Sequence, residues 1–409
     1  MLVNQWFGCS TKEIQSTMDS VTKDTLSQLD NLLAASNQSW LFGAGISLDA
    51  GIPLMWPLTE RVFTRAKDEG EPSDIIVLEF VKSQLSDDSH IEHILSQLGD
   101  HRAIADRSKD KNVAFDTILL SVDDLDGLHQ RILTWIAETI RWGYKPAQPD
   151  GTPEEIGAHE NRIVVIDNHS AFVSALFNRS QAGIAERRRA VRLFTTNYDT
   201  LIEDALALGG FSYWDGFSGG AVAYRSHRYG DDEPNLRDRA HVIKLHGSID
   251  WHLGEDDRVW RVRDGDLYPK KVSRVLIYPQ SIKYLATQRD PFAAQFDLFR
   301  RSLGAREENV LATCGYSFGD EHINQEIELT LQRPENKTTV LAFAQTLNPT
   351  LERWRTGPWG KRVYVISEDG LYAGADGPQA TPNAGAKRDW WTFAGVTKML
   401  NSGAEACAL

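Results

Sequence analysis

Cysteine is scarce in this sequence of 409 residues, which holds only Cys9, Cys314 and Cys407. The three are odd in number and far apart along the chain, so they can form neither a disulfide framework nor a CxxC pair for zinc. Because isolated cysteines are typical of proteins from a reducing compartment, we expect a cytoplasmic protein.

Long apolar runs and several familiar motifs are also missing. No stretch approaches the roughly 18 consecutive apolar residues of a membrane-spanning helix. The first residues, MLVNQWFGCSTKEI, lack the basic and then apolar segments of a secretory signal. There is no G-x-x-x-x-G-K-[ST] for a P-loop and no G-x-S-x-G for a serine hydrolase. We therefore expect no membrane association and no P-loop ATPase activity.

Basic residues are outnumbered by acidic ones. Lys and Arg together number 44, Asp and Glu 57, and the net charge is −13. Nucleic-acid binding needs clustered Lys and Arg to neutralise phosphates, so we expect no direct nucleic-acid binding. Hydrophobic residues make up 41% of the chain. This content predicts a packed core, in one large α/β domain with an insertion or in two domains.

Short apolar segments with the composition of buried strands recur along the chain. They lie at 39–42, 191–196, 241–245, 310–314, 339–343 and 362–366. Helical patterns or long connections separate them. This arrangement predicts an α/β fold with a Rossmann-like, mostly parallel sheet that is covered on both faces.

The segments between these strands predict the domain organisation. Residues 59–189 are mostly helical in pattern, most clearly at 126–142, and are predicted to form a helical insertion. The sheet domain then comprises 1–58 and 190–368. Residues 369–409 are predicted to form an irregular loop and a final helix. The late tryptophans are expected in the core or in an oligomer interface; they are Trp354, Trp359, Trp390 and Trp391.

Gly43, Ala44 and Gly45 follow the first predicted strand. A strand that ends in a glycine turn and opens a helix is typical of a dinucleotide-binding unit. Glycines let the backbone approach a pyrophosphate, and the helix N-terminus faces it. The third glycine of G-x-G-x-x-G is missing, so a purely steric role explains this turn equally well. The following helix is predicted to begin near Ser47.

Polar residues follow later strands in the same way. Asn197 and Asp199 follow the second strand, His246 the third, and Gly315 and Ser317 the fourth. Ligands of open parallel sheets bind outside the carboxyl ends of the strands, so these residues are expected at one site. Taken singly, Asn197 and Asp199 are more typical of helix caps, and a lone histidine is more often structural. Imidazole titrates near neutrality, however, which makes His246 a candidate general base.

Two further histidines were weighed as metal ligands. His90 and His93 stand three residues apart on a predicted helix, with Glu92 between them. The spacing is not H-E-x-x-H, and no third ligand is evident from the sequence. We therefore predict no metal site.

Taken together, the glycine turn and the later strand ends resemble the sirtuin (silent information regulator) family. The segments GAGISLDAGIP at 43–53, TTNYD at 195–199 and LHGS at 245–248 occur in the family's order. The later GYSFGDEHIN at 315–324 is similar to the sirtuin-like proteins of bacterial anti-phage systems. The resemblance spans about residues 38–345 and implies the sirtuin fold, a Rossmann-like sheet with an inserted helical lobe.

The sequence departs from sirtuin deacetylases at two places. Leu54, Met55 and Trp56 follow GIP, where the deacetylases carry a polar residue and then Phe-Arg. The four zinc cysteines that follow their HG motif are absent, and residues 250–268 predict a small β excursion instead. The zinc module helps to form the cleft for acyl-lysine peptides. Its absence favours cleavage of NAD over deacylation, and we expect no zinc module.

The resemblance implies a role for each site residue. The NAD diphosphate would lie on Gly43, Ala44, Gly45 and Ser47, and Asp49 would approach the nicotinamide side. Asn197 would orient the nicotinamide ribose or the attacking water, while Asp199 holds the turn. His246 would be the general base, and Gly315 and Ser317 would contact the adenosine ribose and the phosphates.

The function implied is hydrolysis of NAD to nicotinamide and ADP-ribose, which would deplete NAD in anti-phage defence by abortive infection. NAD is then the substrate, and no metal is required. Two alternatives stay open: a sirtuin-type deacylase or ADP-ribosyltransferase, and a module that senses NAD or ADP-ribose without turnover. The resemblance further implies a homo-oligomer and a HerA-type hexameric ATPase as partner.

Overall fold

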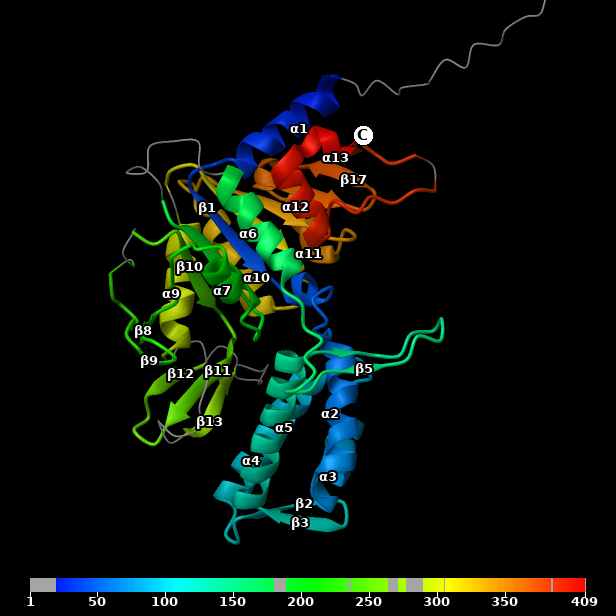
Figure 1. The fold of residues 1–409 in the computed structure, drawn as a ribbon, viewed down its shortest axis with the longest axis vertical. Helices are drawn as coiled ribbons and strands as arrows, with labels where there is room; N and C mark the ends of the chain where they lie inside the picture. Colours follow the sequence, from blue (N-terminus) through cyan, green and yellow to red (C-terminus); the bar gives the residue numbers. More distant parts are fainter. Residues whose placement is uncertain are drawn as a thin grey trace, which may run out of the picture.

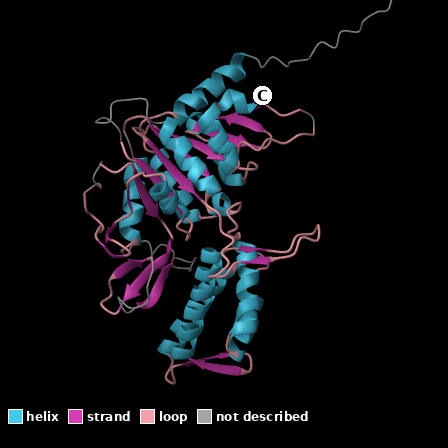
Figure 2. Ribbon diagram, viewed as in Figure 1, coloured by secondary structure: helices cyan, strands magenta, loops and turns pink. Residues whose placement is uncertain are grey.

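The computed structural model describes residues 20–179, 189–232, 234, 237–263, 271–276, 290–304, 306–383 and 385–408. Within these ranges the chain forms a nine-stranded sheet flanked by helices, a helical lobe and a smaller five-stranded sheet (Figure 1, Figure 2). Every described helix is too short or too polar to span a bilayer.

The nine-stranded sheet has the order β18-β17-β16-β15-β14-β1-β6-β10-β7. Neighbouring strands from β16 to β7 are parallel, and β17 and β18 join antiparallel at one edge. The predicted α/β class with a mostly parallel sheet is therefore confirmed. The strands are β1 (Gln38–Phe42), β6 (Val191–Thr195), β7 (Tyr213–Trp214), β10 (Ala240–Lys244), β14 (Asn309–Cys314), β15 (Thr338–Phe343), β16 (Val363–Ser367), β17 (Gly370–Ala373) and β18 (Asp376–Gln379).

Helices cover both faces of this sheet. Side chains alternate between the faces of a strand, so Trp40 and Phe42 of β1 point to one side and Leu41 to the other. The first side packs against α1 (Ser20–Leu33), α6 (Asp167–Arg179), α7 (Leu201–Leu208), α12 (Phe393–Ser402) and α13 (Ala404–Ala408). The second side packs against α9 (Phe292–Leu303), α10 (Glu321–Leu331) and α11 (Pro349–Thr356). Burial on both faces explains why the strands are apolar throughout.

The helical lobe leaves the sheet after β1 and returns to it at β6, the neighbouring strand. Its helices α2 (Met55–Glu69), α3 (Pro72–Ser83), α4 (Ile91–Arg107) and α5 (Val122–Trp142) surround an apolar core of their own. The strands β2 (Asn112–Phe115) and β3 (Ile118–Ser121) pair at its far end (Figure 1). A further pair, β4 (Tyr144–Lys145) and β5 (Glu155–Ile156), lies at the base of a projecting hairpin.

The smaller sheet is antiparallel, with the order β13-β11-β12-β9-β8, and consists of β8 (Phe217–Gly219), β9 (Val222–Arg225), β11 (Gly247–Gly254), β12 (Val259–Val262) and β13 (Lys271–Leu276). Strand β11 begins directly after His246, whereas β8 and β9 precede that residue in the chain. The β excursion predicted at 250–268 is present where the structure describes it, since Trp251 pairs with Arg261. Residues 264–268 of that prediction lie outside the described residues.

Two local predictions are wrong, and one is confirmed. The glycine turn leads into a 3-10 helix, Ala44–Ser47, and the next α-helix begins only at Met55. The positive φ of Gly51 (84°) and the proline at 53 exclude a continuous helix between them. The tail predicted as a loop contains β17 and β18, because the edge of β16 offers a strand to pair with. Trp354 and Trp390 are buried in the core, as predicted, whereas Trp359 and Trp391 are only partly buried and pack against it.

Candidate functional site

The site lies where the strand order of the sheet reverses. From β1 the chain moves to β6 and β10 on one side, whereas β14, β15 and β16 follow on the other side. The connection that follows β1 and the connection that follows the adjacent strand β14 therefore run toward opposite edges of the sheet. A crevice forms outside the carboxyl ends of such a pair, and this is the usual ligand position in open α/β sheets.

Glycines after β1 and β14 bring the two turns into direct backbone contact. A Cβ placed on Gly43 would lie 2.5 Å from the Gly315 carbonyl oxygen, and one on Gly45 2.8 Å from Gly315 Cα. Gly315 has a φ of 64°, which disfavours other residues. The amides of Gly43 and Gly45 donate to the carbonyls of Cys314 and Gly315 at 3.2 and 3.0 Å. These two amides thus hold the turns together.

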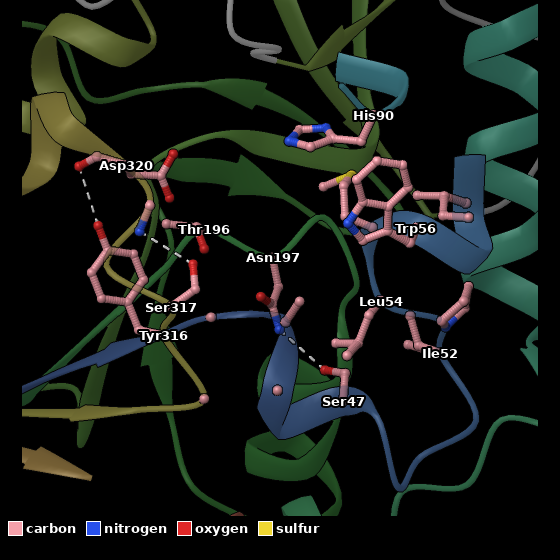
Figure 3. Close-up of a pocket in the computed structure, with 18 of the residues that line it drawn as sticks. Ser47, Ile52, Leu54, Trp56, His90, Thr196, Asn197, Tyr316, Ser317 and Asp320 are labelled. Atoms are coloured by element: carbon pink, nitrogen blue, oxygen red, sulfur yellow. Dashed lines mark hydrogen bonds between the residues drawn. The ribbon is translucent and has the colours of Figure 1, made fainter. Parts of the chain in front are cut away.

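A cavity of about 670 Å³ opens above these turns (Figure 3). Residues at the ends of β1, β6, β10 and β14, and residues of the helical lobe, line this cavity. The sequence-predicted residues that line it are Gly43, Ala44, Gly45, Ser47, Asn197, Asp199, His246, Gly315 and Ser317. Asp49 is exposed on the adjoining turn and is not among the lining residues.

Three buried side chains form a hydrogen-bonded row at the floor of the cavity. Asn197 Nδ2 donates to Ser47 Oγ at 3.1 Å (Figure 3), and Ser47 Oγ donates to Asp199 Oδ2 at 2.8 Å. The other carboxylate oxygen of Asp199 accepts from the Leu201 amide at 3.0 Å at the start of α7. The turn after β6 is therefore tied both to its own helix and to the turn after β1.

The direction of this row determines which atom Asn197 presents to the cavity. A carboxylate only accepts hydrogen bonds, so the Ser47 hydroxyl must give its proton to Asp199. Ser47 Oγ then accepts from Asn197, which has to turn its amide nitrogen toward the serine. The remaining atom, Asn197 Oδ1, is buried and has no hydrogen-bond partner among the described residues. A buried acceptor of this kind calls for a donor from a ligand or a water.

Buried charged and titratable side chains surround Asp199. Lys244 Nζ donates to the Asp199 carbonyl and forms an ion pair with Glu203 at 3.4 Å. Burial raises the pKa of Glu203, and the Lys244 ammonium opposes that shift. Burial also lowers the pKa of His169, although the charge of Asp199 works in the other direction. The surroundings of Asp199 are therefore both densely packed and charged.

His246 closes another side of the cavity and is 4% exposed. Its Nε2 lies 3.2 Å from Nε2 of His322 and 3.9 Å from Oδ1 of Asp320. The two imidazole rings are nearly parallel, at 21°. Asp320 and His322 stand at the N-terminus of α10, so this helix brings them to the end of β10. Neither residue was singled out from the sequence.

The loop after β14 is held in shape by a buried asparagine. Asn324 on α10 accepts from the Tyr316 hydroxyl at 3.2 Å and donates to the Phe318 carbonyl at 2.7 Å. Phe318 has a φ of 61°, an unusual backbone conformation that the two hydrogen bonds of Asn324 stabilise. Ser317 Oγ accepts from the Gly319 amide at 3.3 Å (Figure 3). Much of the GYSFGDEHIN segment therefore serves to shape the wall of the cavity.

Residues 191–356 match the SIR2-like domain. This family model spans β6 to α11 and includes Asn197, His246 and Gly315. The comparison with curated proteins gave no match. Among solved structures, the chain is similar to one described as a Sir2 homolog–NAD complex, at 11% identity and a TM-score of 0.39, covering 94% of this chain and 95% of that one. That TM-score is too low to carry an argument.

The residues that match the SIR2-like domain contribute only part of the cavity. The glycine turn at 43–45 and Ser47 lie before the matched residues, and the fold brings them to it through the β1–β6 and β1–β14 pairings. Leu54 and Trp56, which follow GIP, line the mouth and are 38% and 44% exposed. Glu92 of the helical lobe also lines the cavity and accepts from the Tyr198 hydroxyl at 2.8 Å. The lobe is thereby joined to the turn after β6 at the rim of the cavity.

Proposed function

We propose that this protein binds NAD in the cavity and hydrolyses it to nicotinamide and ADP-ribose. One observation carries the proposal: Asn197 Oδ1 is a buried, oriented acceptor in a cavity that also contains His246 and the glycine turn. The SIR2-like match is consistent with chemistry on NAD. The volume of about 670 Å³ also suits a dinucleotide-sized ligand.

The reaction makes modest demands on the protein. Nicotinamide in NAD is already a cationic leaving group, so breaking its glycosidic bond gives an oxocarbenium-like centre, as in glycoside hydrolysis. The protein has to hold the ribose, exclude bulk water and admit one water molecule. Asn197 Oδ1 would accept a hydrogen bond from a ribose hydroxyl or from that water. His246 Nε2 would take the proton that the water or the ribose gives up.

The test is to incubate the full chain with NAD, alone and together with a HerA-type ATPase, and to quantify nicotinamide and free ADP-ribose by mass spectrometry. We expect both products in equal amounts. Asn197→Ala and His246→Ala should each lower the rate by at least about 100-fold. His159→Ala, at an exposed histidine of the projecting hairpin, is the matched control and should cleave like the wild type.

Three results would contradict the proposal. If both variants cleaved NAD at the wild-type rate, the site assignment would be wrong. Nicotinamide release that strictly required an acceptor protein would favour a deacylase or an ADP-ribosyltransferase. A ligand-induced rise in melting temperature without any nicotinamide release would favour a sensing module.

The cellular role and partners form a separate part of the proposal. Constitutive hydrolysis of NAD would harm the host, so the activity requires a gate. The resemblance to anti-phage proteins suggests a homo-oligomer that is controlled by a HerA-type hexameric ATPase. The acidic charge of −13 is consistent with a subunit that leaves DNA to its partner. Light scattering of the chain alone, and then with a HerA-type ATPase added, tests both expectations.

A further inference from the structure

Three potential metal ligands converge at the edge of the cavity, although their distance in sequence gives no metal motif. His246 follows β10, whereas Asp320 and His322 lie at the start of α10, and 76 residues separate the two histidines. One ligand atom from each residue lies within 4.8 Å of the other two. The pair of Nε2 atoms is 3.2 Å apart, and the His246 Nε2 to Asp320 Oδ1 distance is 3.9 Å.

These separations fit a tetrahedral ion. With bonds of about 2.0–2.1 Å, two ligands of a tetrahedral zinc ion are about 3.3 Å apart. The two imidazole nitrogens already have that spacing, and the Asp320 oxygen, at 3.9 Å from His246 Nε2, lies slightly farther away. Without a metal, one imidazole donates its Nε2–H to the lone pair of the other ring, and a metal ion would replace that proton. A metal ion uses both lone pairs and also the carboxylate.

We propose that His246, Asp320 and His322 form a binding site for a divalent transition-metal ion, of which Zn²⁺ is the representative. Two imidazoles with one carboxylate suit zinc and its neighbours rather than magnesium or calcium, which prefer oxygen ligands. His246 and Asp320 both line the cavity, so an ion held by these residues would lie at its edge. Three protein ligands and one open position are typical of an exchangeable or reactive site.

The regulatory consequence rests on the proposed function. Nε2 of His246 has one lone pair, which either coordinates the metal or accepts a proton from water or ribose. The ion and the general base therefore exclude each other at this atom. Zn²⁺ bound here inhibits NAD hydrolysis, and its removal by a chelator restores it.

Metal binding is tested without NAD. The full chain is stripped with a chelator and titrated with Co²⁺, followed by its visible absorption, and with Zn²⁺ by calorimetry. We expect one ion per chain and the strong d–d bands of four-coordinate Co²⁺. His322→Gln should weaken binding by more than about tenfold, because it removes one of the three ligands. His159→Gln and His90→Gln, the latter at the cavity rim, should bind like the wild type.

X-ray absorption of the Zn²⁺-loaded wild-type protein gives a second measurement that needs no variant to fold. Two imidazole ligands and oxygen in the first shell support the site. Absence of stoichiometric binding, or unchanged affinity in a folded His322→Gln protein, would overturn it. Zn²⁺ that bound yet accelerated hydrolysis would overturn the inhibitory role. A protein that cleaved NAD but bound no metal would refute this inference and leave the proposed function standing. A protein that bound the metal but cleaved no NAD even after the metal was removed would refute the proposed function and leave the metal site standing.

Discussion

Ser47 Oγ donates a hydrogen bond of 2.8 Å to Asp199 Oδ2, across 152 residues of sequence. This bond links the turn after β1 to the turn after β6. It also orients Asn197, because the serine oxygen has only acceptor capacity left for the asparagine amide. The serine hydroxyl is 99% buried within this row, so its contribution to a ligand site is to position Asn197 and Asp199.

Replacement of Ser47 by alanine should therefore affect both stability and activity. Ser47→Ala leaves one Asp199 oxygen and the Asn197 amide nitrogen buried without their partner, which costs about 2 kcal/mol of unfolding free energy. We also expect slower NAD hydrolysis, because Asn197 loses its fixed orientation. Urea denaturation and the product assay measure the two effects. Ser83→Ala, at an exposed hydroxyl, should change neither. If Ser47→Ala and Ser83→Ala lost the same unfolding free energy and the same activity, the role assigned to Ser47 would be wrong.

The contact between the glycine turns predicts a steric effect at Gly315. A Cβ at this residue would lie 2.5 Å from the Ile46 amide nitrogen, and the backbone has a φ of 64°. Gly210 has a similar φ of 71° but nothing within 4 Å of its would-be Cβ. Gly210→Ala should lower the free energy of unfolding by about 1 kcal/mol, because only the backbone conformation is unfavourable. Gly315→Ala should lower it by about 3 kcal/mol or more, because the added Cβ also clashes with its neighbours. Thermal unfolding of both variants measures the difference, and similar losses would show that the close approach is unimportant.

Trp56 at the cavity mouth should contribute to NAD affinity and little to folding. Its side chain is 44% exposed and lines the cavity beside Leu54. Stacking of a base on an aromatic ring is worth about 1–3 kcal/mol, so Trp56→Ala should raise KM for NAD by roughly tenfold with a smaller change in kcat. The melting temperature should stay near that of the wild type. Leu208→Ala, an exposed apolar residue on α7, is the control. An unchanged KM would exclude contact between Trp56 and NAD.

The helical lobe should lose stability in mild acid. Burial lowers the pKa of His129 to about 4 from the ordinary 6.5, with a smaller opposing effect of Asp126. The unfolded chain therefore takes up a proton below pH 6.5 while the folded chain stays neutral, so stability falls as the pH falls from 6.5 toward 4. Between pH 7 and pH 5 the loss is about 2 kcal/mol.

Replacement of His129 by glutamine should remove most of this pH dependence. Urea denaturation of His129→Gln and of the wild type at pH 7 and pH 5 makes the comparison. His159→Gln, at an exposed histidine, should keep the wild-type dependence. If His129→Gln lost as much stability between the two pH values as the wild type, another group would be responsible.

Much of the sheet was predictable because burial on both faces leaves a clear signature. The strands that carry the site, β1, β6, β10 and β14, are apolar runs that end in glycine or polar residues. The 3-10 helix at Ala44–Ser47 was not predictable in this way, since its four residues are too few for a periodic pattern. The strands β17 and β18 were missed because they pair with an edge that only the assembled sheet provides.

The sequence by itself determined the residue types at the strand ends, and thereby the set of groups available for chemistry: Asn197, Asp199, His246 and the glycines. Only the tertiary structure decided what each group contacts. Ser47 turned out to face Asp199 and Asn197, and His246 to face His322 and Asp320. The physical reason is that hydrogen bonds and metal ligation act over about 2–4 Å, whereas these partners are tens to hundreds of residues apart in the chain and meet only through strand order.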